Sequence, residues 1–149
     1  MNQHPYLRAY MAGISVPTPF LLVVLTLFSS ARFIYNMPVP IERIIIFPMA
    51  VIPNVWGLWN MLHLASRTRM RLPLGIHGAI LPFILAPAGF LLGRFLGFLL
   101  FTGQGFVYFG ILNIQFTHIA LIFPLAVIIY YLAWKYLIGA LNQVVGIAE

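Results

Sequence analysis

The chain has 149 residues, of which 62% are hydrophobic and 7% are charged, and its net charge is +6. Soluble domains carry about 25% charged residues, so this composition excludes an ordinary soluble domain. The absence of cysteine and aspartate excludes disulfides, thiolate metal sites, a cysteine nucleophile and paired aspartates. Any chemistry must therefore take place in a membrane, at its surface or in a partner protein.

Charged residues divide the chain into four long uncharged runs. The runs contain 23, 23, 22 and 40 residues, and they are 9–31, 44–66, 72–93 and 95–134. A helix needs about 20 apolar residues to cross the core of a bilayer. The pattern predicts an all-α polytopic membrane protein, with one domain over residues 1–149 and four transmembrane helices in an up-down bundle bent by internal prolines. The predicted spans are 17–35, 41–65, 74–101 and 116–138.

The first span follows a segment of interfacial character, residues 1–16. Thr18 and Pro19 form a reasonable helix start, because proline is tolerated in the first helical turn. Residues 20–28, followed by the small residues 29–31, also resemble a secretory signal. We expect this segment to be retained and to serve as a span.

The second span carries the most polar face of any predicted helix. Four residues spaced by four, three and four positions share this face: Trp56, Asn60, His63 and Arg67. Polar residues inside a membrane are candidate functional residues that face the bundle interior. The alternative is that Asn60 and His63 bond neighbouring helices while Arg67 reaches lipid headgroups.

Two histidines, His63 and His77, lie seven residues on either side of Met70. In an antiparallel hairpin they would lie at one depth, where neutral imidazoles could ligate haem iron or another metal. Neighbouring helix axes lie about 8–10 Å apart, which is tight for an iron between two imidazoles. We therefore expect no cofactor, and haem at these histidines is the alternative.

The loop that follows the second span contains three arginines: Arg67, Arg69 and Arg71. Basic loops face the cytoplasm and attract anionic lipid headgroups. With four spans, both termini are then cytoplasmic. The sequence predicts a protein of the bacterial inner membrane whose partners are lipids and other membrane subunits or a second copy, and no nucleic acid.

The third span contains a doubled G-x-x-x-G pattern. Gly89, Gly93 and Gly97 recur every four residues, and Ala86 extends the same narrow face. Such a face lets another helix approach closely in lipid. The nearby Arg94 could pair with Glu42, for which Arg32 and Arg43 compete, or could reach outward to the headgroups. An ion- or substrate-binding role is the alternative for Arg94.

These features favour a non-catalytic accessory or assembly subunit of a larger membrane complex, packed through the glycine face. Hydrolase, metalloprotease and phosphate-loop motifs are absent from the sequence. A small four-span transporter or channel is the first alternative, although such exchangers need an acidic residue deep in a span. A haem-binding subunit for electron transfer is the second alternative.

Overall fold

The computed structural model describes residues 4–44, 49–108, 110 and 112–147, and these are mostly helical. In chain order the elements are α1 (Pro5–Ser15), α2 (Pro17–Phe33), α3 (Ile41–Ile44), α4 (Ile52–Met70), α5 (Leu74–Phe95), β1 (Leu99–Thr102), β2 (Gly105–Tyr108), β3 (Leu112–Gln115), α6 (Phe116–Leu132), the π-helix η2 (Ala133–Ile138) and α7 (Gly139–Val144).

Three stretches of helix are long and apolar enough to cross a membrane: Pro5–Phe33, Leu74–Phe95 and Phe116–Val144. The first joins α1 to α2, so the segment that was expected to be interfacial is helical from Pro5 onward. α4 is not among these stretches, because its 19 residues include two asparagines, one histidine and two arginines. Four spans are therefore not confirmed among the described residues.

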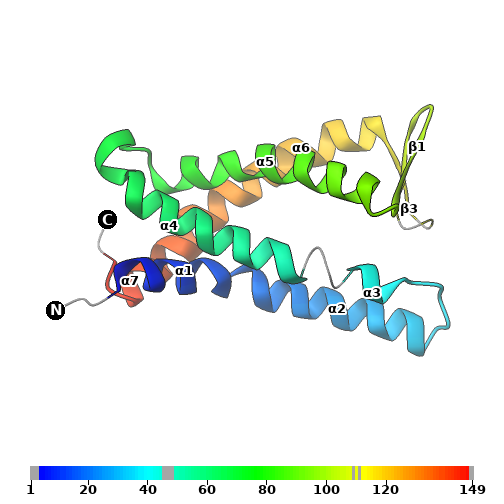
Figure 1. Ribbon diagram of the computed structural model, residues 1–149, viewed down its shortest axis with the longest axis horizontal. Helices are drawn as coiled ribbons and strands as arrows, with labels where there is room; N and C mark the ends of the chain where they lie inside the picture. The colour runs from blue at the N-terminus through cyan, green and yellow to red at the C-terminus, as the bar shows by residue number, and fades with distance from the viewer. Residues whose placement is uncertain (1–3, 45–48, 109, 111, 148–149) are drawn as a thin grey trace.

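The two ends of the molecule differ in content (Figure 1). Both termini lie at one end with the α4–α5 connection, and we call this the arginine end because that connection follows Arg67 and Arg69. The sheet lies at the opposite end, with the α2–α3 connection, and we call this the sheet end. α1 packs against α4, and α5 packs against α6.

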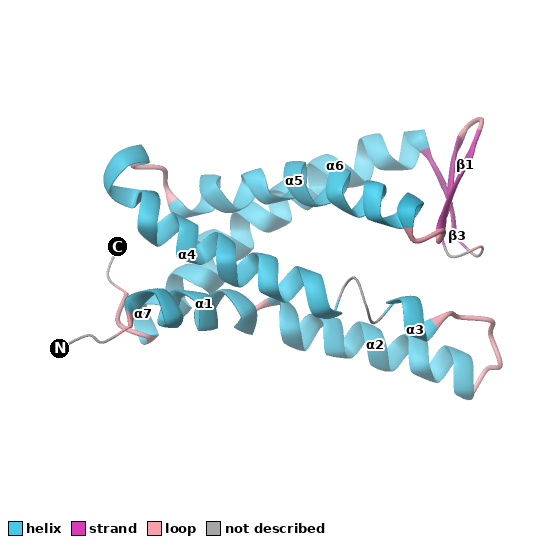
Figure 2. Ribbon diagram, viewed as in Figure 1, coloured by secondary structure: helices cyan, strands magenta, loops and turns pink. Residues whose placement is uncertain are grey.

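A small antiparallel sheet corrects the all-α prediction (Figure 2). Its strand order is β1-β2-β3, with Leu99 opposite Tyr108 and Gly105 opposite Gln115. A two-residue turn, residues 103–104, joins β1 to β2, which is the commonest length for a hairpin. A side chain on Gly105 would overlap the backbone of β3, so only glycine fits there.

The predicted third span, 74–101, ends earlier than expected because α5 stops at Phe95. Gly97 adopts a left-handed conformation with φ of 72°. The Phe98 N–H donates to the Gly93 carbonyl at 3.0 Å, and the Gly97 N–H donates to the Arg94 carbonyl at 3.2 Å. These two bonds form a Schellman motif, which terminates a helix at a glycine. Gly97 is thus a helix stop and lies outside the helical face on which it was predicted.

The buried core lies toward the arginine end and is built around two tryptophans. Trp56, Leu74, Leu81, Trp134 and Ile138 form its main cluster. The Trp56 and Trp134 rings lie 5.5 Å apart between centroids. Lipid tails are as apolar as these side chains, so moving a side chain from lipid into the core gains little free energy. Close packing of this kind is therefore a main source of association between helices in a membrane.

Glycines set the closest helix contacts. An added Cβ on Gly13 of α1 would lie 2.6 Å from the Trp56 carbonyl oxygen and 2.7 Å from the Gly57 Cα of α4. On α5, an added Cβ at Gly78 would overlap the Trp134 side chain. Both positions therefore act as holes that a neighbouring helix fills.

A π-helix interrupts the long helix Phe116–Val144. η2 places Trp134 and Ile138 fully inside the core, whereas α6 before it has no buried residue. π-helical turns are rare, and they are frequent at functional sites. Here the wide turns separate an exposed outer helix from a buried inner one.

Candidate functional site

A cluster of polar side chains lies beside the tryptophan core, and we call it the polar junction: Trp59, Asn60, His63, His77 and Asn142. Asn60 on α4 and Asn142 on α7 are almost completely buried, with 1% and 3% of their surface exposed. The Asn60 Nδ2 donates to the Asn142 Oδ1 at 2.8 Å, and the Asn142 Nδ2 donates back to the Asn60 Oδ1 at 3.2 Å. The Asn60 Nδ2 also donates to the Ala9 carbonyl at 2.8 Å. One side chain thus joins α1, α4 and α7.

His77 joins α4 to α5 through a second reciprocal contact. The Trp59 Nε1 donates to the His77 carbonyl at 2.9 Å, and the His77 Nε2 lies 3.1 Å from the Trp59 carbonyl oxygen. A carbonyl oxygen can only accept, so the His77 Nε2 carries the proton in this contact. The two rings also stack, with their centroids 4.7 Å apart. Both polar atoms of this pair are therefore used in holding the helices together.

The four residues of the predicted polar face differ in burial. Trp56 and Asn60 are buried, His63 is partly buried and Arg67 is exposed. The structure does bring His63 to His77, as the hairpin symmetry predicted, with 4.9 Å between the ring centroids. The two rings are therefore in direct contact, and the His77 Nε2 lies within hydrogen-bonding distance of the Trp59 carbonyl. No group of three metal-ligating side chains occurs among the described residues.

A very small cavity opens beside the Asn60–Asn142 pair. Its volume is about 20 Å³, and its lining includes His63, Arg67 and the two asparagines. A cavity of at least about 10–15 Å³ with polar walls can hold one water molecule. The junction can therefore hold a water, and its geometry is that of a structural polar network.

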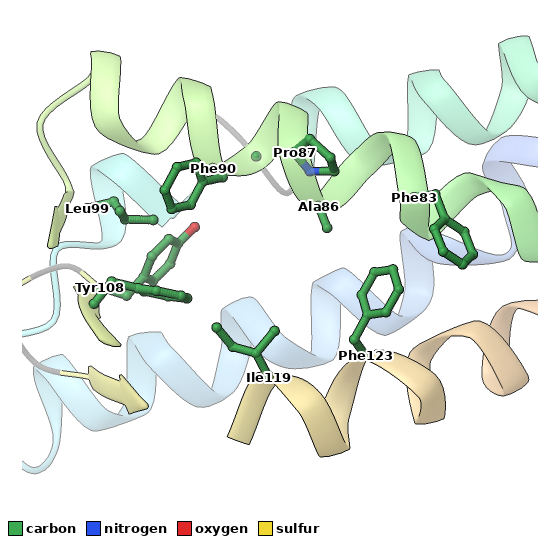
Figure 3. Close-up of a pocket in the computed structure, with 10 residues that line it drawn as sticks. Phe83, Ala86, Pro87, Phe90, Leu99, Tyr108, Ile119 and Phe123 are labelled. Carbon is green, nitrogen blue, oxygen red and sulfur yellow. The ribbon is translucent and has the colours of Figure 1, made fainter. Parts of the chain in front are cut away.

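The predicted glycine face leads to a different kind of site, which we call the sheet-end cavity. Ala86 and Gly89 line a cavity of about 590 Å³ between α5, α6 and the sheet (Figure 3). Gly93 is buried by its own chain, because an added Cβ would lie 2.9 Å from Phe98 and 3.1 Å from Leu99.

The walls of the sheet-end cavity are almost wholly apolar. Among the ten described residues that line it, Tyr108 alone carries a polar side chain, and its hydroxyl points into the space between α5 and α6 (Figure 3). Burial raises the pKa of the Tyr108 hydroxyl, so it remains a protonated donor at neutral pH. The Phe83 and Phe123 rings meet edge to face at 5.0 Å and narrow the cavity toward the core.

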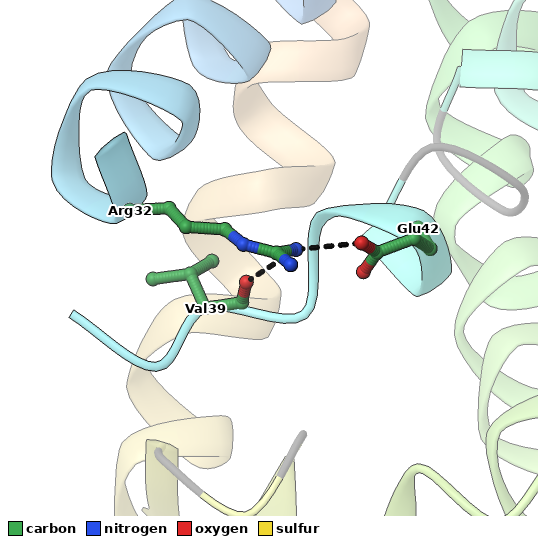
Figure 4. A network of polar contacts seen from close by, with 3 residues as sticks. All are labelled: Arg32, Val39 and Glu42. Atoms are coloured by element: carbon green, nitrogen blue, oxygen red, sulfur yellow. Dashed lines mark hydrogen bonds and ion pairs between the residues drawn. The ribbon is translucent and has the colours of Figure 1, made fainter. Parts of the chain in front are cut away.

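The predicted Glu42–Arg94 ion pair is corrected by the structure. The Glu42 carboxylate instead accepts a hydrogen bond from Arg32 at 2.7 Å, and the same arginine reaches the Val39 carbonyl at 3.4 Å (Figure 4). A backbone hydrogen bond and the Arg32 contact lower the pKa of Glu42. The Glu42 side chain is 71% exposed.

Arg94 lies over an aromatic ring. Its guanidinium carbon is 5.6 Å from the Phe101 ring centroid, which is a cation–π distance. The arginine is exposed near the end of α5. Arg67, Arg69 and Arg71 are exposed at the opposite end of the molecule, where a role at lipid headgroups stays a prediction.

Trp56 and Asn60 were singled out from the sequence, but several of their packing partners were not. Asn142 lies beyond the last predicted span, and Gly13, Gly57 and Gly78 lie outside the doubled G-x-x-x-G pattern. A local signal for Gly78 did exist, because Gly75 and Gly78 are three residues apart and share a face.

Comparisons of the chain with protein-family models, curated proteins and solved structures found no match. The fold and the sites therefore define a class by physical properties alone. The chain is a helical protein with three helices that could cross a membrane and a small sheet at one end.

Proposed function

We propose that the chain is a non-catalytic accessory or assembly subunit of a larger integral membrane complex. The observation that best supports this role is an exposed face of small residues on α2. Thr26 is exposed, and Ser30 lies four residues later and is partly exposed. Small residues at this spacing let two membrane helices approach closely.

Most of α2 is left unburied by the described residues, although Leu25, Phe28 and Ala31 pack against Val39 and Ile41. Only Pro17 and Leu21, near its start, are buried. The flanking Leu22 and Phe33 are 51% and 74% exposed. α2 therefore offers a long apolar surface with a narrow strip at its centre, which suits an apolar transmembrane helix of a partner protein.

The hydroxyls on this strip are satisfied within α2 itself. Thr26 donates to the Leu22 carbonyl at 2.8 Å, and Ser30 donates to the Thr26 carbonyl at 2.9 Å. The strip is thus compatible with lipid before assembly, and each hydroxyl oxygen keeps acceptor capacity for a donor on the partner.

Neighbouring residues on α2 provide a matched test of the subunit role. We expect Thr26→Leu to reduce co-purification of a membrane partner, because the added bulk holds the partner helix away. Leu27 is 65% exposed and lies on another face of the helix, so Leu27→Phe should leave association unchanged. Native gels and mass spectrometry of the protein in mild detergent measure this. Equal association of both variants with wild type would reject the α2 interface, and a wild-type chain that purifies alone would reject the subunit role.

The proposed location is the bacterial inner membrane, with the arginine end in the cytoplasm. The support is the clustering of both termini with the α4–α5 connection at that end (Figure 1), because basic segments are retained on the cytoplasmic side. Arg67, Arg69 and Arg71 would then lie at anionic headgroups. Single cysteines at Thr68 and Gln104 should react with an impermeant reagent from opposite sides, and reaction of both from one side would reject this orientation.

A further inference from the structure

The sheet-end cavity exists because α5 and α6 pack well at one end only. Toward the arginine end, small residues of α5 receive large aromatic ones: an added Cβ on Gly75 would lie 2.8 Å from the Tyr131 ring, and Gly78 receives Trp134. Toward the sheet end, the small residues Ala86 and Gly89 face a space of about 590 Å³. Protein interiors are normally packed as densely as organic crystals, so an empty space of this size is unusual. Its volume lies within the range of known ligand pockets.

The shape and depth of the cavity indicate what kind of molecule fits. It is partly open, it lies between two helices that are apolar enough to cross a membrane, and its walls are aromatic and aliphatic. Phe83 and Phe123 narrow one end, and Leu99 of the sheet lies at the other (Figure 3). A flexible hydrocarbon chain entering from the bilayer matches this lining.

A positive charge lies at the sheet end of the same wall. Phe90 lines the cavity, its ring lies 4.9 Å from the Phe101 ring, and Phe101 in turn lies beneath the Arg94 guanidinium. Ala86 and Arg94 are eight residues apart on α5, which is about 12 Å along a helix. The described carboxylate, Glu42, pairs with Arg32 instead.

We propose that the sheet-end cavity binds one glycerophospholipid, with an acyl chain between α5 and α6 and its phosphate at Arg94. The charge of the arginine complements the phosphate, and the distance along α5 places the phosphate at the interface when the chain fills the cavity. This site is independent of the proposed subunit role, because α2 contributes no residue to it.

Photolabelling of the full-length protein in phosphatidylcholine vesicles tests the proposal. The first probe is a phosphatidylglycerol with a diazirine in its acyl chain, and the second is a diacylglycerol with the same chain and no phosphate. Labelled peptides are mapped by mass spectrometry. Wild type should be labelled mainly around Ile119 and Phe123, which line the cavity, rather than evenly over the exposed faces.

Matched variants separate chain binding from phosphate binding. Ala86→Leu places added bulk inside the cavity where the acyl chain would lie, so labelling by both probes should fall about tenfold. Ala88→Leu, which lies outside the cavity lining, should leave labelling unchanged. Arg94→Gln should reduce labelling by the phospholipid alone. Gel filtration and thermal unfolding confirm that each variant is folded.

Three outcomes would overturn the proposal. Even labelling of all exposed helix faces would show that the cavity holds no preferred lipid. Equal labelling of wild type and Ala86→Leu would show that the chain does not lie between α5 and α6. Equal effects of Arg94→Gln on both probes would exclude the phosphate contact and leave only a neutral apolar ligand.

Discussion

The buried asparagine pair gives a prediction whose magnitude follows from the hydrogen bonds. Three bonds involve Asn60: one to the Ala9 carbonyl and two shared with Asn142. At about 0.6 kcal/mol for each hydrogen bond between membrane helices, Asn60→Ala should lower the free energy of unfolding by about 2 kcal/mol, and Asn142→Ala by about 1 kcal/mol. The two shared bonds are lost in either variant. The double variant should therefore be less destabilised than the sum of the singles by about 1 kcal/mol.

Unfolding in mixed micelles with increasing sodium dodecyl sulfate provides the assay. Trp56, Trp59 and Trp134 all lie in or beside the core next to this pair. Intrinsic tryptophan fluorescence therefore reports the unfolding of this core directly. Each single variant also loses packing, and the same packing losses occur in the double variant. Subtracting the two single effects from the double effect cancels these losses and leaves the energy of the interaction between the two amides. Strictly additive effects would refute the reasoning, because they would mean that the two amides do not interact in the folded protein.

The remaining predictions concern a glycine and an ion pair. Gly78→Ala should lower the free energy of unfolding by about 1–3 kcal/mol, because the added methyl group overpacks against Trp134. The control is Gly103→Ala, which should have little effect because no atom lies within 4 Å of the added Cβ. An equal loss of stability in both variants would contradict the packing role of Gly78. The Arg32 contact helps to lower the pKa of Glu42, so its stabilisation is present above the ordinary pKa of a glutamate and is lost as the pH falls through the lowered pKa. Hydrogen exchange in residues 36–42, corrected for intrinsic rates, should therefore accelerate between about pH 7 and pH 3 in wild type, and an equal acceleration in Glu42→Gln would exclude the carboxylate as its cause.

Periodicity and charge spacing predicted much of the helical structure. The uncharged runs correspond to α2, α5 and α6, because an uninterrupted apolar run of about 20 residues has few stable alternatives to a helix in lipid. The same rule does not separate strand from helix in short apolar segments. Residues 99–115 are uncharged and mostly apolar, and the predicted spans placed 99–101 in a helix and 102–115 in the connection between spans. The sheet was missed for this reason.

The candidate sites depended on contacts that sequence spacing cannot provide. Asn60 was identified from its place on a polar helical face, but its partner Asn142 lies 82 residues away. Gly97 shares the four-residue spacing of its face, yet spacing does not distinguish a packing glycine from a helix-ending one, since both need a missing side chain. Glu42 was close to two candidate arginines in the sequence, and only the folded chain selects Arg32.

The π-helix at Ala133–Ile138 makes the chain unusually sensitive to changes of length. Trp134, Ile138 and Asn142 are all buried and recur every four residues, while α6 immediately before them has no fully buried residue. Each residue advances a helix by about 100°. Deletion of one residue within η2 would rotate Asn142 away from Asn60 without altering a single apolar side chain elsewhere. In this segment the number of residues constrains the fold more tightly than their identity.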